Sequence, residues 1–192
     1  MSKNVSQQRR LILKAAAMTG VAAAFGQRGA AQGASAASVV QNGDVLVYQS
    51  GTNAEKPINP KDLKEGEPVL AFAMDPKTKQ IRDKTKGNIV VVKLKAADIK
   101  ASSKSNAADG IVAYSAICTH QGCAVSKIGS LGSAKGNLDC PCHHSLFDPR
   151  DNAKVVGGPA PRRLPALPLK LEAKGVQIAA TGGFIGRVGT GK

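Results

Sequence analysis

The chain is predicted to fold as an all-β, antiparallel domain of about 150 residues that carries a small inserted subdomain. After residue 40 the sequence contains no long amphipathic helix, and short runs of β-branched residues alternate with turn signals. All four cysteines and all three histidines lie between Cys118 and His144. This concentration of metal-binding side chains places the inserted subdomain at about residues 116–162.

The predicted strands follow one another along the body of the chain. They are residues 44–48, 69–74, 88–94, 111–117, 167–172 and 176–180. Ala173-Lys174-Gly175 predicts a hairpin between the last two. Residues 96–108 have room for one short helix within a loop, and the charged stretch 77–86 is expected to be a solvated turn.

Cysteine and histidine form two half-sites in the inserted subdomain. The first has the spacing C-x-H and the second C-x-x-H, and each carries one extra cysteine. They read Cys118-Thr119-His120-Gln121-Gly122-Cys123 and Cys140-Pro141-Cys142-His143-His144-Ser145. Thiolates suit iron–sulfur centres and neutral imidazole suits iron. A 2Fe–2S cluster with two histidines on one iron has a higher potential than an all-cysteine cluster. The pattern therefore indicates a centre held by two cysteines and two histidines.

Other interpretations of the window remain. Four cysteines and two histidines can bind zinc. A zinc finger, however, rarely has a C-x-H half-site followed by Gly-Cys, or a proline between Cys140 and Cys142. A pure disulfide scaffold leaves the histidines without a role. His144 is interpreted as an exposed loop residue beside the centre, because the C-x-x-H spacing selects His143.

The half-sites Cys118-x-His120 and Cys140-x-x-His143 resemble those of Rieske iron–sulfur proteins. The resemblance covers roughly residues 60–190 and implies a Rieske-type antiparallel β domain with a 2Fe–2S cluster. It implies that Cys118 and Cys140 bind the buried iron and that His120 and His143 bind the outer iron. It also implies a disulfide between the extra cysteines, Cys123 and Cys142.

Four further features are compared with high-potential members of that family. Gly158-Pro159-Ala160-Pro161 resembles the stiff proline-rich loop that covers the cluster in quinol–cytochrome c reductases. Ser145 matches a serine that donates to a bridging sulfide. Phe147 stands where relatives often have tyrosine, so a potential-raising hydroxyl is missing, which would suit menaquinol. Gln121 stands where reductase subunits often have leucine, in the loop that shields the cluster and touches the quinol-oxidising site. How this loop docks at that site is therefore left open.

The resemblance implies an electron-transfer subunit of a quinol–cytochrome c oxidoreductase, which is not catalytic alone. It would take an electron from quinol, with the proton leaving through the quinol-facing ligand His143, and pass the electron to a c-type cytochrome. Cytochrome b would supply the quinol site.

The alternative is the small subunit of arsenite oxidase, which is an electron relay. Phe147 favours this alternative, whereas the 158–161 loop favours the reductase. The export signal and the extra cysteines disfavour a soluble Rieske ferredoxin.

The front of the chain resembles a twin-arginine export signal. Arg9 and Arg10 precede a moderately apolar run at 15–25, and the first forty residues contain no acid. Ala34-Ser35-Ala36 offers a cleavage site, whereas the family resemblance favours a retained membrane anchor. We expect a signal or anchor at 1–25, a flexible tether at 26–42 and the Rieske domain at 43–192. The head would then lie on the periplasmic face of a bacterial cell membrane.

The chain is strongly basic, with a formal net charge of +14. Without the first forty residues, 22 basic and 13 acidic residues remain. No nucleic-acid-binding motif accompanies this charge, and aromatic residues for base stacking make up only 3%. We therefore expect no nucleic-acid partner. The basic head either meets an acidic cytochrome c or uses its lysines for solubility.

Overall fold

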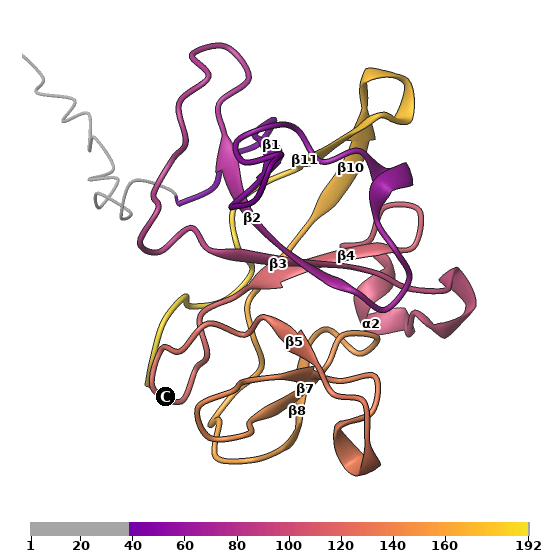
Figure 1. Ribbon diagram of the computed structural model, residues 1–192, viewed down its shortest axis with the longest axis vertical. Helices are drawn as coiled ribbons and strands as arrows, with labels where there is room; N and C mark the ends of the chain where they lie inside the picture. Colours follow the sequence, from indigo (N-terminus) through magenta and orange to yellow (C-terminus); the bar gives the residue numbers. More distant parts are fainter. Residues whose placement is uncertain (1–38, 192) are drawn as a thin grey trace, which may run out of the picture. The chain divides into compact units, whose positions relative to one another are not determined.

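The structure, a computed structural model, describes residues 39–191, and its regular secondary structure is almost entirely antiparallel strand (Figure 1). The larger sheet has the order β10-β11-β1-β2-β3-β4-β9 and the smaller sheet the order β5-β6-β7-β8. The larger sheet contains β1 Val45–Tyr48, β2 Pro68–Met74, β3 Ile89–Lys93, β4 Ile111–Ser115, β9 Ala166–Leu167, β10 Leu169–Glu172 and β11 Gln177–Ala180. The smaller contains β5 Lys127–Ile128, β6 Leu138–Asp139, β7 Leu146–Asp148 and β8 Lys154–Gly157. The predicted all-β class is confirmed.

Short helical segments lie in the connections. The predicted helix within 96–108 appears as a 3₁₀ turn, Ala96–Asp98, followed by α2, Ala101–Lys104. Further 3₁₀ turns are Pro60–Asp62, Gly132–Ala134 and Ala173–Gly175. The last of these joins β10 to β11, as the predicted hairpin requires.

One predicted strand is divided in the structure. Residues 167–172 were expected to be continuous, but the run is split into β9 and β10 at Pro168. Proline has no N–H to donate to a sheet ladder and its φ is fixed, so the pairing is interrupted there. The two parts form opposite edges of the larger sheet, and β10 also contacts β4. The sheet therefore curves round into a barrel-like shape.

The central strands are buried on both faces. In β3, Ile89 and Val91 pack into the core of the larger sheet, whereas Val90 and Val92 pack into a second core with the smaller sheet. Strand β4 alternates in the same way. This double burial explains why these strands read as continuous apolar runs instead of alternating ones. The second core also contains Cys118 and Cys140 and so supports the metal-binding window.

The charged stretch 77–86 is mostly exposed, as expected of a solvated turn. Arg82, however, folds back onto the sheet. Its Nη2 lies 2.8 Å from Oδ1 of Asp44, which is 1% exposed, and 3.2 Å from Oδ2 of Asp75. A buried carboxylate needs a paired charge, so Arg82 fixes this turn against the sheet.

The smaller sheet is attached to the larger one through the turn after β7. The Tyr114 hydroxyl on β4 donates to the Pro149 carbonyl at 2.7 Å. In α2, Ser103 Oγ donates to the Arg150 carbonyl at 2.9 Å and accepts from Asn152 N–H at 2.6 Å. Lys100 just before α2 lies 3.3 Å from Asp148. These contacts fix the two sheets to one another.

Replacing Tyr114 by phenylalanine is expected to lower the free energy of unfolding by about 1 to 2 kcal/mol, because the buried Pro149 carbonyl loses its donor. Burial raises the pKa of Tyr114 from 10.0 to about 12. Stability from this group is therefore present below pH 10 and lost between about pH 10 and 12, by roughly 2 to 3 kcal/mol. Urea unfolding at pH 7 and across this alkaline range measures both effects. An identical alkaline loss in Tyr114→Phe would contradict the assignment.

Part of the sequence prediction lies beyond the described residues. This applies to the signal or anchor at 1–25 and to residues 26–38 of the predicted tether. Of its remaining residues, Val40 is buried in the core of the larger sheet. Within 39–191, no helix has both the length and the apolar character needed to cross a bilayer.

Candidate metal centre

The two half-sites form loops with the same backbone pattern. In the first loop, Cys118 N–H donates to Cys123 O at 2.9 Å, and Gly122 N–H donates to Cys118 O at 2.9 Å. In the second, Cys140 N–H donates to Ser145 O at 3.0 Å, and His144 N–H donates to Cys140 O at 2.9 Å. Each loop is therefore a closed six-residue turn that begins with a predicted cysteine ligand.

The two predicted thiol ligands are buried and unbridged. Cys118 and Cys140 are each 1% exposed and take part in no disulfide. Burial raises the pKa of the Cys140 thiol, and the neighbouring Cys118 thiol adds to the rise. A bound metal would favour the thiolate form of both residues.

The two predicted imidazole ligands lie next to each other. The ring centroids of His120 and His143 are 4.8 Å apart, with the rings nearly perpendicular. His120 Nδ1 is buried, and no described residue is its hydrogen-bond partner. A buried polar atom without a partner is costly, so this nitrogen is suited to bind a metal. His143 is exposed. Two free thiols and two adjacent imidazoles fit a centre with mixed ligands.

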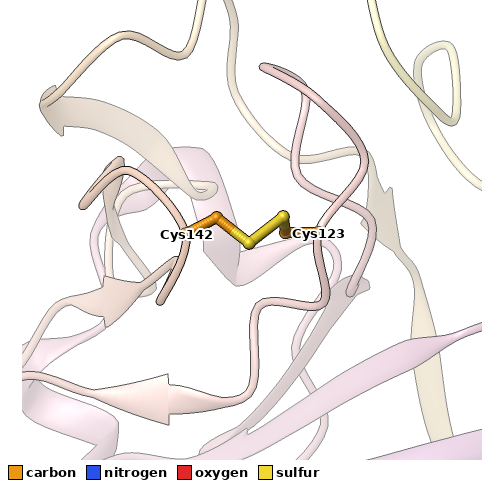
Figure 2. The surroundings of a disulfide bond; sticks show 2 residues. All are labelled: Cys123 and Cys142. Atoms are coloured by element: carbon orange, nitrogen blue, oxygen red, sulfur yellow. A yellow bond between two sulfur atoms is a disulfide. The ribbon is translucent and has the colours of Figure 1, made fainter.

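A disulfide joins the two loops (Figure 2). Cys123 and Cys142 are bridged with Sγ–Sγ 2.01 Å, and this is the pairing that the family resemblance implied. The Sγ atoms of Cys123, Cys140 and Cys142 lie within 4.8 Å of one another. Two of these three sulfurs are consumed by the disulfide, so this group is not itself a metal site.

The proline-rich loop lies against the second half-site. Ala160 N–H donates to Ser145 Oγ at 3.1 Å. Gly158 has φ +77°, and a Cβ there would lie 2.4 Å from the His144 carbonyl oxygen, so only glycine fits. Ser145 Oγ uses a lone pair for Ala160 and keeps its own proton for another acceptor. The predicted donation from Ser145 to the cluster stays a prediction.

Three other predicted positions differ in burial. Phe147 on β7 is fully buried in the core that contains Cys118 and Cys140. Gln121 and His144 are exposed. His144 Nδ1 lies 3.4 Å from Asp139 Oδ1, and the His120 ring contacts His143 instead. The ring beside His120 is therefore that of His143 and not that of His144, and the assignment of His143 as a ligand stays a prediction.

Sequence reasoning missed two residues that support the first loop. Thr119 lies between the predicted ligands Cys118 and His120, and its hydroxyl donates to the Arg162 carbonyl at 2.6 Å. Arg162 directly follows the proline-rich loop. The only signals in the sequence were these two adjacencies, because the contact spans 43 positions.

A barrel-like antiparallel domain that presents two cysteines and two histidines on disulfide-linked loops defines an iron–sulfur protein of the electron-transfer class. Comparison with family models agrees, since residues 56–168 match the Rieske [2Fe-2S] domain. The chain belongs to the Rieske iron–sulfur family, and its cofactor is a 2Fe–2S cluster.

Known proteins with similar sequences are Rieske subunits. A protein of Haloferax mediterranei named respiratory nitrate reductase subunit Rieske is 51% identical over 82 residues, which cover 43% of this chain and 34% of that protein. The cytochrome bc1 complex Rieske iron-sulfur subunit of Streptomyces lividans is 35% identical over 144 residues, which cover 71% of this chain and 81% of that one. The chain thus spans about a third of the first relative and four fifths of the second.

A solved structure also shows similarity. It is the soluble domain of Rieske protein II from Sulfolobus acidocaldarius, at 26% identity and a TM-score of 0.41. The match covers 55% of this chain and 67% of that one.

Proposed function

We propose that this chain is the Rieske iron–sulfur subunit of a quinol–cytochrome c oxidoreductase. It takes an electron from quinol and passes it to a c-type cytochrome, while cytochrome b provides the quinol site. The observation that carries the proposal is the pair of disulfide-linked loops beneath a fixed 158–161 loop, with His143 exposed. The Streptomyces lividans bc1 subunit, matched over four fifths of its length, supports it.

In this proposal Cys118 and Cys140 would hold one iron of the cluster, and His120 and His143 would hold the other. The bound cluster supplies a one-electron couple whose potential is raised because imidazoles replace two thiolates. The chain's own residues protect and orient it. Both thiols are excluded from water, and the disulfide keeps the loops together.

His143 is proposed to contact the quinol. It is exposed, whereas His120 is half-buried with one ring nitrogen inside the protein. A histidine that binds iron through one ring nitrogen has a second nitrogen on the other side of the ring. When that nitrogen of His143 carries no proton of its own, it can accept a hydrogen bond from quinol and then its proton.

Purification of the tagged full chain from its native membranes tests the proposed function. We expect cytochrome b and a c-type cytochrome to co-purify and quinol to reduce cytochrome c in the preparation. Protease treatment of spheroplasts tests the periplasmic location, and membrane fractionation tests the proposed anchor in residues 1–25. A chain that purifies without any cytochrome, and whose fraction does not oxidise quinol, would refute the proposal.

The Haloferax mediterranei relative supports a second candidate, an electron-transfer subunit of a respiratory nitrate reductase. Its identity to this chain is 51%, although over only 82 residues. The same purification separates the candidates, since a nitrate-reducing subunit would co-purify in place of cytochrome b. The comparisons do not favour the arsenite oxidase alternative.

Phe147→Tyr is expected to raise the reduction potential by about 40 mV. A new hydrogen bond to a ligand thiolate would stabilise the reduced form by about 1 kcal/mol, and a one-electron couple shifts by 59 mV for each tenfold change. Phe147 is fully buried in the core that contains both ligand cysteines, which puts the hydroxyl in reach of that region. Redox titration followed by EPR measures the shift. An unchanged potential in a fully loaded variant would show that the hydroxyl does not reach the thiolate.

A further inference from the structure

The side chain of Arg162 holds the last described part of the chain. Residues 185–191 are here called the C-terminal strap. Arg162 Nη1 donates to Arg187 O at 2.6 Å, Nη2 donates to Gly189 O at 2.6 Å, and Nε donates to Gly191 O at 3.0 Å. One guanidinium thus binds three alternate carbonyls, which a shorter or more flexible side chain does not reproduce.

The strap reaches from the larger sheet to the first ligand loop. At its start, Ile185 N–H donates to Ala166 O at 2.7 Å, which fixes it to β9. Near its end, Thr190 Cγ2 lies 3.5 Å from the position that a Cβ on Gly122 would occupy. Figure 1 shows the yellow end of the chain running beside the loop that precedes β5. The strap therefore packs against the loop that begins with Cys118.

The backbone of Arg162 contacts the same loop from another side. Its carbonyl accepts the Thr119 hydroxyl at 2.6 Å. Thr119 is fully buried and stands between Cys118 and His120. Arg162 therefore makes two connections. Its side chain binds the strap, and its backbone carbonyl binds Thr119, which lies between two proposed ligands.

Among the contacts of the Arg162 side chain that the structure describes, only the three strap carbonyls stabilise its charge. No carboxylate of residues 39–191 forms an ion pair with it, and burial together with the charge of Arg187 lowers its pKa. A partly desolvated cation without a carboxylate depends on the carbonyl oxygens around it. The position of Arg162 therefore depends on the strap as much as the strap depends on Arg162.

We propose that Arg162 is a positioning residue, which uses the C-terminal strap and Thr119 to hold the first ligand loop in its metal-binding conformation and to slow loss of the cluster. The inference rests on the proposed ligand roles of Cys118 and His120.

Arg162→Gln and its matched control Arg163→Gln test this in the full, cluster-loaded chain. Both remove one positive charge, but Arg163 is exposed, and the three strap carbonyls accept their side-chain hydrogen bonds from Arg162. The first readout is tryptic cleavage after Arg187, followed by mass spectrometry. The second is bleaching of the visible absorbance of the cluster in the presence of a chelator.

In Arg162→Gln we expect both rates to rise at least about tenfold, because charge-assisted hydrogen bonds are lost, whereas Arg163→Gln leaves both unchanged. Thr119→Val should speed bleaching and leave cleavage after Arg187 unchanged, since the side chain of Arg162 still binds the strap. If Arg162→Gln does not fold, Arg162→Lys replaces it. This variant keeps the charge but not the three-point contact, and both rates should still exceed those of the unsubstituted chain.

Two results would overturn the inference. One is faster cleavage with unchanged bleaching in Arg162→Gln, which would make the strap irrelevant to the ligand loop. The other is equal bleaching in the Arg162 and Arg163 variants. Failure of the proposed ligand set looks different, because the unsubstituted chain would then carry no acid-labile sulfide although the strap is still protected from trypsin.

Discussion

His143→Ala is expected to abolish the 2Fe–2S centre. The variant removes one of the four proposed ligands, and it leaves His120 without the neighbouring ring whose centroid lies 4.8 Å away. Since metal binding contributes to folding, the inserted subdomain should also lose stability. Iron and acid-labile sulfide analysis, with EPR after dithionite reduction, measures the loss. A fully loaded His143→Ala protein would contradict the proposed ligand set.

His144→Gly is the matched control for that experiment. His144 has φ +54°, a conformation that costs a non-glycine residue about 1 kcal/mol or more. Its side chain is 78% exposed, so its contact with Asp139 contributes little. The variant should therefore keep the cluster and be about 1 kcal/mol more stable. Loss of the cluster here, and its retention in His143→Ala, would assign the ligand role to His144.

Removing the disulfide is expected to have the second largest effect. The double variant Cys123→Ala, Cys142→Ala should lose about 3 kcal/mol of unfolding free energy, because the bridge closes a loop across 19 positions in the unfolded chain. The cluster should also be lost faster, since the bridge directly links the two ligand loops. Urea unfolding and the rate of visible bleaching measure the two effects.

The single variant Cys142→Ala serves as the comparison. It is measured with a reductant that keeps Cys123 as a free thiol and leaves the cluster intact. It should resemble the double variant, because either change opens the bridge. Unchanged unfolding in the double variant would mean that the two loops are held in place by packing alone. Cys118 and Cys140 remain untouched in both variants and so keep their proposed role.

The larger sheet could be predicted from the sequence because its strands are long enough to show a local pattern. Strands β1 to β4 coincide with the predicted runs to within a few residues. The break at Pro168 was also encoded, since proline interrupts a ladder. Strands β5 to β8 were not predicted. They have only two to four residues each, and they form because Leu138 and Phe147 pair across β6 and β7 and are buried together.

That the two half-sites come together could be predicted because their cysteines and histidines are concentrated in adjacent residues. The spacing indicated Cys118, His120, Cys140 and His143, and the structure brings the two thiols into one buried core and the two imidazoles together. The support around them could not be predicted in the same way. Arg162 binds carbonyls 25 to 29 positions away, and such contacts depend on how the chain folds back.

The contacts of α2 and Tyr114 with the turn after β7 have a consequence for electron delivery. Tyr114 and Ser103 bind the backbone at Pro149 and Arg150 from inside the protein, so the metal-bearing tip has no hinge at this junction. A change in distance between the tip and a redox partner then requires translation or rotation of residues 39–191 as one body.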